Sequence, residues 1–266
     1  MKTLEHIIAQ KRQEVDLRKN LYPEKLLETS VYFDTDSISL KKYLLRPDKA
    51  GIIAEFKKQS PSVGIINQYA DIEKISIGYM QAGASALSVL TDKKYFGGTN
   101  EDLTQARKFN YCPILRKDFV IDEYQILESK SIGADAVLLI ASVLSIDEIE
   151  KLIQFAHRLK LEVLLEIHDE TEIEKIHPAA DVVGINNRNL KTMTTDIQHS
   201  INLIKKIPSD FVIISESGIS RPEDLLKLRE AGFHGFLIGT EFMMHARPHQ
   251  ACRDFIHKYN QLKETV

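Results

Sequence analysis

This sequence contains no tryptophan and only two cysteines, Cys112 and Cys252, among 266 residues. The cysteines lie far apart, and neither belongs to a Cys-x-x-Cys pair. Disulfide-stabilised folds and structural zinc sites need several closely spaced cysteines, so the sequence argues against both. We therefore expect two reduced thiols, as is usual in a cytoplasmic protein.

The sequence also lacks a long apolar segment and a strong excess of charge of either sign. No apolar run approaches the roughly 20 residues that a membrane-spanning helix needs. The N-terminal stretch MKTLEHIIAQKRQEV is interrupted by charged residues and has no signal-peptide core. The 35 Lys and Arg residues nearly balance the 38 Asp and Glu residues, for a net charge of −3. We expect no membrane partner, no nucleic-acid partner and a cytoplasmic location.

Short apolar runs alternate with segments of helical spacing along most of the chain. Hydrophobic residues make up 43% and charged residues 27% of the sequence, the composition of a globular protein. Eight apolar runs, short enough to be strands, begin at Gly51, Ala84, Cys112, Ala134, Leu161, Asp181, Phe211 and Gly235. Helical spacing predicts helices over 72–82, 103–109, 123–132, 146–159, 170–176, 197–207 and 222–231, and an eighth helix after Pro248.

This alternation predicts a parallel sheet covered by helices, because strands that are apolar on both faces are typical of such sheets. Eight βα units in one domain of this size most simply close into a single (β/α)8 barrel, the TIM-barrel architecture. An open doubly wound sheet is the alternative. It is disfavoured because no Gly-x-Gly-x-x-Gly motif follows the first strand.

Residues 1–48 precede the predicted barrel. Leu4, Ile7, Ile8 and Val15 recur near helical spacing among charged residues, which predicts an amphipathic helix. This segment is too polar for a core of its own. We therefore expect an N-terminal helical extension, residues 1–48, packed on a catalytic barrel domain, residues 49–266. We also expect the first thirty-odd residues of this extension to cover the rim of the barrel as a lid.

A pair of charged residues interrupts the first apolar run. In the stretch GIIAEFKKQSPSVG, residues 51–64, Glu55 and Lys57 stand two residues apart and so point to the same face of a strand. Charges at the end of a buried strand are costly unless they are paired or used. A structural ion pair and a functional site both explain this pair, and the same pattern recurs at later strand ends.

Polar side chains follow the end of every predicted strand. In a (β/α)8 barrel these ends form one rim, where active sites lie. The rim residues are Glu55, Lys57, Thr91, Asp92, Arg116, Lys117, Asp118, Ser142, Glu166, His168, Asn186, Asn187, Arg188, Glu216, Ser217 and Thr240. Solvated loops do not need so many lysines and carboxylates on one rim, so this convergence predicts an active site.

Small residues after the last two strands predict a phosphate site. Gly218 ends the stretch SESG, and Gly239 lies in FLIGTEF. Their backbone N–H groups can approach a ligand closely, and barrels of this kind commonly bind phosphate at these two loops. A role in turns alone is the alternative for each glycine.

Five motifs, in order, resemble indole-3-glycerol phosphate synthase, the ring-closing lyase of tryptophan biosynthesis. They are IIAEFKKQSPS from Ile52, LRKDF from Leu115, LLEIHD from Leu164, GINNRNL from Gly184 and SESGI from Ser215. The resemblance runs from about residue 37 to residue 247 and includes the N-terminal extension. It implies ring closure of 1-(2-carboxyphenylamino)-1-deoxyribulose 5-phosphate with loss of carbon dioxide and water, and no cofactor.

The resemblance also implies roles for residues of this sequence. Lys117 matches the general acid that protonates the ketone oxygen, and Lys57, beside Glu55, matches the lysine that holds the departing carboxylate. Glu166 matches the base, or the charge-stabilising carboxylate, of the later steps, and Glu216 and Asn186 match residues that orient the intermediate. The implied pocket for the anthranilate ring is Phe96, Phe119 and Leu138, and the residues left for the carboxylate, hydroxyls and phosphate are Ser60, Arg188, Ser217, Gly218, Gly239 and Thr240.

Other interpretations fit parts of this pattern. His168 shares a strand face with Glu166, but no third metal ligand is evident, so we expect no metal. A barrel like phosphoribosylanthranilate isomerase needs a Cys and Asp pair, which does not explain two lysines and three glutamates at the rim. A barrel that only binds a phosphorylated ligand has no need of those charges. The expected partner is a phosphorylated small molecule, and either a monomer or a homodimer fits the sequence.

Overall fold

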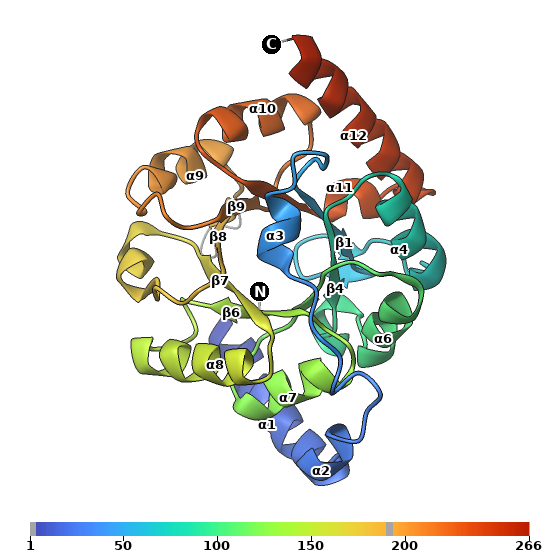
Figure 1. The fold of residues 1–266 in the computed structure, drawn as a ribbon, viewed down its shortest axis with the longest axis vertical. Coiled ribbons are helices and arrows are strands. Elements are labelled where there is room, and N and C mark those ends of the chain that lie inside the picture. Colours follow the sequence, from blue (N-terminus) through green and yellow to red (C-terminus); the bar gives the residue numbers. More distant parts are fainter. Residues whose placement is uncertain (1–3, 190–193, 266) are drawn as a thin grey trace.

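Eight parallel strands close into a barrel in this computed structural model, which describes residues 4–189 and 194–265 (Figure 1). The strands are β1 (Ile52–Phe56), β4 (Ala86–Leu90), β5 (Ile114–Lys117), β6 (Ala136–Ile140), β7 (Glu162–Ile167), β8 (Val182–Asn186), β9 (Ile213–Glu216) and β10 (Gly235–Ile238). Each strand pairs with its neighbours in this order, and β10 pairs with β1 to close the ring. The predicted (β/α)8 barrel is confirmed, and the open sheet is excluded.

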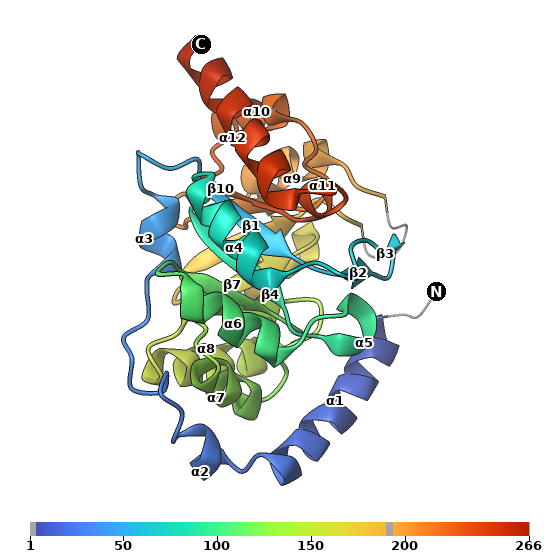
Figure 2. The same ribbon diagram turned by 90° about the vertical axis from the view of Figure 1, so that its right-hand side faces the viewer.

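Helices follow the strands and cover the outside of the barrel. They are α4 (Ile72–Gln81), α6 (Asn100–Phe109), α7 (Glu123–Ser131), α8 (Ile146–Arg158), α9 (Ile197–Ile204), α10 (Pro222–Glu230) and α12 (Pro248–Thr265). Side-chain caps fix several helix starts; at α8, the backbone N–H of Ser145 donates to Glu148 at 2.8 Å in a capping box. α12 packs against both α10 and α4, so the last helix closes the outer layer onto the first (Figure 2).

The segment after β7 differs from its prediction. The helical spacing of residues 170–176 predicts an α-helix, but the structure has a single 3-10 helix, η1 (Glu170–Lys175). Pro178 follows closely and disfavours helical backbone at His177, so the segment is too short for a stable α-helix. Asp169 caps the first turn of η1 by accepting from the backbone N–H of Thr171 at 2.9 Å.

Short elements at the rim also escaped prediction. The loop after β1 folds into a small hairpin of β2 (Gln59–Ser60) and β3 (Gly64–Ile65). α5 (Lys93–Phe96) follows β4, and α11 (Thr240–Met243) follows β10. Each is too short to show a periodic pattern in sequence, yet each places residues beside the carboxyl ends of the strands.

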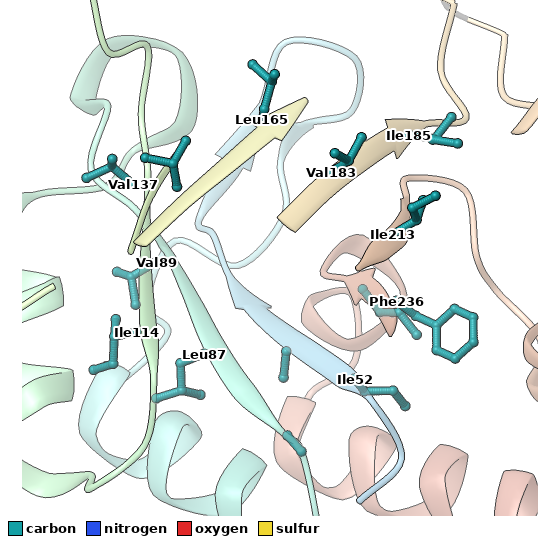
Figure 3. Close-up of a cluster of buried hydrophobic side chains, with 14 of the residues drawn as sticks. Ile52, Leu87, Val89, Ile114, Val137, Leu165, Val183, Ile185, Ile213 and Phe236 are labelled. Carbon is teal, nitrogen blue, oxygen red and sulfur yellow. The ribbon is translucent and has the colours of Figure 1, made fainter. Parts of the chain in front are cut away.

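Alternate residues of each strand face two different cores. On β1, Ile52 and Ala54 face outward to the helices, whereas Ile53 faces the interior of the barrel. Figure 3 shows part of the outer core. Ile52, Leu165 and Phe236 are among the labelled side chains, and each projects from a different strand. This period of two explains why the strands are apolar on both faces.

The N-terminal elements reach both ends of the barrel. α1 (Leu4–Leu21) runs alongside it, with its first turn near α5, and α2 (Glu24–Leu27) follows (Figure 2). The chain then passes to the amino ends of the strands, where α3 (Leu40–Leu44) inserts Leu40 and Leu44 into the inner core. Within residues 4–189 and 194–265, no helix combines the length and apolarity needed to cross a membrane.

Candidate active site

The alternation that fills the inner core places charged residues in its last layer. Glu55, Lys117, Glu166 and Glu216 each stand two residues after an apolar inner-core residue of the same strand. Side chains two residues apart on a strand point to the same face. All four therefore project into the barrel at the carboxyl ends of the strands.

Lys117 occupies the centre of this charged layer. Its Nζ atom donates to Glu166 Oε2 at 2.9 Å and to Glu216 Oε2 at 2.5 Å. The three residues come from β5, β7 and β9, so these ion pairs cross the barrel interior. Gly184 of β8 makes room for them, because a Cβ atom there would lie 2.1 Å from Glu216 Oε1.

Burial and neighbouring charge set the protonation of this trio. Burial alone would lower the pKa of Lys117, but Glu166, Glu216 and Glu55 outweigh it and raise that pKa. Burial raises the pKa of Glu216 to about 8, with repulsion by Glu166 adding to it and Lys117 opposing it. Burial acts the same way on Glu166, but Lys117 and His168 hold its pKa well below the usual value. The two glutamates therefore differ: the pKa of Glu166 is lowered, which keeps it ionised, whereas the pKa of Glu216 is raised, so Glu216 takes up a proton more readily.

Glu55 and Lys57 form an ion pair next to this trio. Lys57 Nζ donates to Glu55 Oε1 at 2.8 Å, and both side chains line the same cavity as Lys117. Gly239 at the end of β10 permits this arrangement, because a Cβ atom there would lie 2.4 Å from Glu55 Oε1. The pair thus has the geometry of a structural ion pair and also faces the candidate site.

One arc of the cavity is apolar. Phe96, Phe119 and Leu138 come from the successive units of β4, β5 and β6. The ring centroids of Phe96 and Phe119 lie 6.2 Å apart. Adjacent strands supply these residues, so they form one continuous wall suited to a planar apolar group.

Small and polar residues from β8, β9 and β10 line another arc. After β9, Ser217 and Gly218 both have positive φ, at 70° and 66°. Positive φ is uncommon for serine and turns the chain sharply at this point. After β8, Arg188 Nη1 donates to Ser62 of the β1 loop at 2.8 Å, and the backbone N–H of Arg188 donates to Asn186 Oδ1 at 3.0 Å.

Every predicted catalytic and substrate-binding residue lines a single cavity of about 1190 Å³. Ser60 and Thr240, like the residues described above, are part of its wall. The first half of α1 adds Leu4, Ile7 and Arg12, which no motif identified as site residues. Their only signal in the sequence is the amphipathic pattern that led us to expect a lid.

A family comparison identifies the barrel to which this cavity belongs. The model of the family described as indole-3-glycerol phosphate synthase matches residues 4–255. The chain belongs to the indole-3-glycerol phosphate synthase family. The match spans the N-terminal helices and the barrel, and it confirms the resemblance indicated by the five motifs. The predicted class of enzyme, a carboxy-lyase of tryptophan biosynthesis, is that of this family.

Curated relatives agree with the family match. An indole-3-glycerol phosphate synthase of Bacteroides thetaiotaomicron is 49% identical over 253 residues, covering 95% of this chain and 97% of the relative. One from Caldanaerobacter subterraneus is 44% identical, covering 90% and 93%. One from Campylobacter fetus is 40% identical, covering 94% and 98%.

Solved structures support the fold alone. Tryptophan synthase subunit alpha from Legionella pneumophila superposes with a TM-score of 0.62 at 14% identity, covering 85% of this chain and 98% of that one. Thiamine phosphate pyrophosphorylase from Pyrococcus furiosus gives a TM-score of 0.60 at 12% identity, covering 84% and 99%. At these identities the likeness indicates a shared barrel and no shared reaction.

The structure corrects the expected role of several rim residues. Arg116 points out of the barrel, opposite to Lys117, and does not line the cavity. Asp92 and Asp118 do line it, but their carboxylates pair with Lys11 of α1 at 2.8 and 2.9 Å. Asp92 and Asp118 therefore hold α1 on this synthase-family barrel through Lys11, and their paired carboxylates are not available to bind a ligand.

The cysteines lie away from the cavity. Cys112 and Cys252 are free, buried thiols, and neither is part of the cavity wall. Burial raises the pKa of Cys112 to about 12 and also raises that of Cys252. A thiol-dependent isomerase site is therefore excluded. Among the described residues, no group of three or more His, Cys, Asp or Glu side chains is arranged to hold a metal ion.

Proposed function

We propose that this chain converts 1-(2-carboxyphenylamino)-1-deoxyribulose 5-phosphate to indole-3-glycerol phosphate, with loss of carbon dioxide and water. The main support is the Lys117 ammonium, held between Glu166 and Glu216 in a cavity that Lys57 also lines. The name shared by the curated relatives supports the substrate. The conversion is redox-neutral, so side chains that move protons and stabilise charge are sufficient, and we propose no cofactor.

The order of strands around the barrel suggests how the substrate lies. The anthranilate ring packs on the apolar wall of Phe96, Phe119 and Leu138, and the phosphate lies at Gly218 and Gly239. Ser217, Thr240, Ser60 and Arg188 supply polar contacts to the phosphate, hydroxyls and carboxylate. The reacting carbon atoms then lie between these two ends, next to Lys117.

Ring closure joins the ring carbon that bears the carboxylate to the ketone carbon of the sugar chain. Negative charge builds on the ketone oxygen, and Lys117 donates a proton to it, leaving a hydroxyl group. Lys57, beside Glu55, holds the carboxylate until it leaves as carbon dioxide. The electron pair of the broken bond restores the aromatic ring.

Loss of water then forms the remaining double bond of the indole. Glu166, the ionised carboxylate, accepts the proton lost from the new ring, and Lys57 protonates the departing hydroxyl. Glu216 and Asn186 face the same space and orient the intermediate. The distinct protonation of the two glutamates is consistent with distinct roles for them.

We further propose that residues 1–48 serve as an extension of the catalytic barrel domain, residues 49–266. The contacts of α1 with the cavity and of α3 with the inner core support this division. A cytoplasmic location is consistent with the two free thiols. For the oligomeric state, a monomer and a homodimer both stay predictions.

A direct assay tests the function. The purified chain is incubated with the carboxyphenylamino-deoxyribulose phosphate, and indole fluorescence and released carbon dioxide are measured together. Because the chain has no tryptophan, product fluorescence rises over a low background. We expect equal amounts of both products. Binding of the substrate without either product would contradict the proposal and favour a binding protein.

A further inference from the structure

His168 is a buried histidine that the proposed mechanism does not use. It follows β7 directly and continues the alternation of that strand, so its ring lies on the same face as Glu166. It is only 7% exposed and lines the cavity. Its ring is therefore shielded from water and interacts mainly with the charged side chains that surround it.

His168 and Lys117 hold the two oxygens of Glu166 separately. His168 Nε2 lies 3.1 Å from Glu166 Oε1, while Glu166 Oε2 accepts from Lys117 Nζ at 2.9 Å. Glu216 has no such second cation: its Oε1 atom has no hydrogen-bond partner among the described residues. The two glutamates share one ammonium, and His168 stands beside only one of them.

The position of His168 is fixed by residues from two neighbouring units. Glu172 of η1 accepts from the backbone N–H of His168 at 2.7 Å, and its Oε2 atom lies 3.7 Å from His168 Nδ1. On α9, His199 Nε2 donates to the carbonyl oxygen of His168 at 2.7 Å. The backbone N–H and the carbonyl oxygen of His168 are thus both hydrogen-bonded, which fixes the position of the residue.

The charges around the ring favour the imidazolium form. Glu166 faces one ring nitrogen of His168, and Glu172 faces the other. Lys117 is paired with the other oxygen of Glu166, so Glu166 lies between the ring and the Lys117 ammonium. Burial alone would lower the pKa of His168, but the two carboxylates outweigh it and raise that pKa to about 10. The contacts are ion pairs, because neither ring nitrogen has an aligned hydrogen-bond partner among the described residues.

We propose that His168 is a positioning residue for Glu166. Its imidazolium pairs with Oε1, keeps Glu166 ionised in preference to Glu216, and directs Oε2 to Lys117. The inference rests on the proposed function, in which Glu166 is the base. His168 thereby decides which of the two buried glutamates can accept a proton.

The variant His168→Gln removes the charge and keeps a polar side chain. We expect kcat to fall about 10–100-fold, by analogy with residues that orient the ligands of a metal site, and KM to change much less. A base works only when ionised, so kcat is lost as the pH falls through the pKa of Glu166. Losing a cation raises that pKa, and the acid limb of the kcat profile should move up by about 1 pH unit or more.

His157→Gln is the matched control. His157 Nε2 is hydrogen-bonded to Asp181 Oδ2 at 2.9 Å on the outside of the barrel, so the same substitution removes a histidine–carboxylate contact away from the cavity. If His168→Gln had the kcat, KM and acid limb of this control while Glu166→Gln was inactive, the inference would be wrong and the proposed function would stand. If Glu166→Gln kept its activity, the proposed base itself would be wrong.

A measurement on the unchanged protein covers the case in which His168→Gln does not fold. Nitrogen NMR of imidazole-labelled protein distinguishes imidazolium from neutral imidazole. Among the nine histidines, the His168 signal is assigned by its shift in Glu172→Gln, in which Gln still accepts from the His168 backbone. We expect imidazolium at pH 8. A neutral His168 ring at pH 7 would overturn the inference.

Discussion

Arg116 and Lys117 are neighbours on β5, yet they belong to two separate charge clusters. Lys117 points into the barrel and forms the inner cluster with Glu166 and Glu216. Arg116 points outward and pairs with Glu128 of α7 at 2.6 Å. The outer cluster, which consists of Arg116, Glu128, Asp118, Asp92 and Lys11, connects α1 to the barrel wall.

The two clusters differ in how completely their groups are paired. Asp118 accepts a hydrogen bond from Thr91 at 2.6 Å and also pairs with Lys11. Burial alone would raise the pKa of Asp118, but Lys11 and Arg116 outweigh it and lower that pKa to about 2. Among the described residues, no polar atom of the outer cluster is buried without a partner, whereas Glu216 Oε1 in the inner cluster is. Both clusters contribute residues to the cavity wall, but among the described residues only the inner cluster has a buried carboxylate oxygen without a hydrogen-bond partner. Charge at a strand end therefore indicates a site only on the face where pairing is incomplete.

The largest expected effect comes from Lys117→Met. Loss of a positioned general acid lowers kcat by about 10²–10⁴-fold, with a much smaller change in KM. Stability should fall little, because Glu216, whose pKa is already raised to about 8, can take up a proton once its cation is gone. Steady-state kinetics by indole fluorescence and urea unfolding measure the two effects.

Two lysine variants serve as controls for Lys117→Met. Lys58→Met removes a lysine that pairs with Asp102 at 2.8 Å on the outer side, and it should leave kcat unchanged. Lys57→Met should raise KM as well, because Lys57 also holds the substrate carboxylate. A folded Lys117→Met variant with near-normal kcat would refute the assignment and leave Lys57 as the acid.

Arg116→Met should show the opposite pattern. It leaves Glu128 and Asp118 without one of their cations in a buried place, which typically costs about 3–5 kcal/mol of unfolding free energy. The kcat of the folded variant should stay near that of the wild type. Arg158→Met is the control, since Arg158 pairs with Glu123 at the surface and its loss should cost little. A large loss of kcat in folded Arg116→Met would show that the two clusters are coupled.

The sequence predicted the inner cluster well because strands have a period of two. Lys117 follows an apolar residue at the same parity, as does Glu166, so their common face can be read from the chain. The same rule assigns Arg116 to the opposite face. Arg116 and Lys117 follow each other in the chain, so by this rule only one of them can face the site.

Other features could not be read from the sequence because their partners are remote in the chain. Lys11 lies on a helix rich in charged residues, and nothing local indicates that Asp92 and Asp118 bury it. The sequence pattern indicates a metal ligand as the only alternative role for His168, whereas its partner Glu172 comes from η1, a 3-10 helix where helical spacing predicts an α-helix. The roles of Lys11 and His168 depend on tertiary contacts, which the periodicity of the sequence does not reveal.

Lys11→Met is expected to lower stability less than Arg116→Met does, because α1 runs along the outside of the barrel (Figure 2) and can detach without opening the strands. If its buried cation is removed, α1 can detach and let Asp92 and Asp118 meet water, so the unfolding free energy should fall by only about 1–2 kcal/mol. KM should rise more than kcat falls, since the first half of α1 lines the cavity. Faster amide hydrogen exchange in α1, with unchanged exchange in the strands, would report the detachment.

Lys19→Met tests whether this effect comes from the buried cation. Lys19 lies on the same helix but pairs with Asp122 in a partly exposed position at 2.8 Å, so its loss should change neither KM nor exchange appreciably. If Lys11→Met released α1 while KM stayed at the wild-type value, the helix would be a packing element without a role at the rim. If KM rose while exchange in α1 stayed slow, Lys11 would act on the cavity through Asp92 and Asp118, which precede α5 and Phe119, and not by holding a lid.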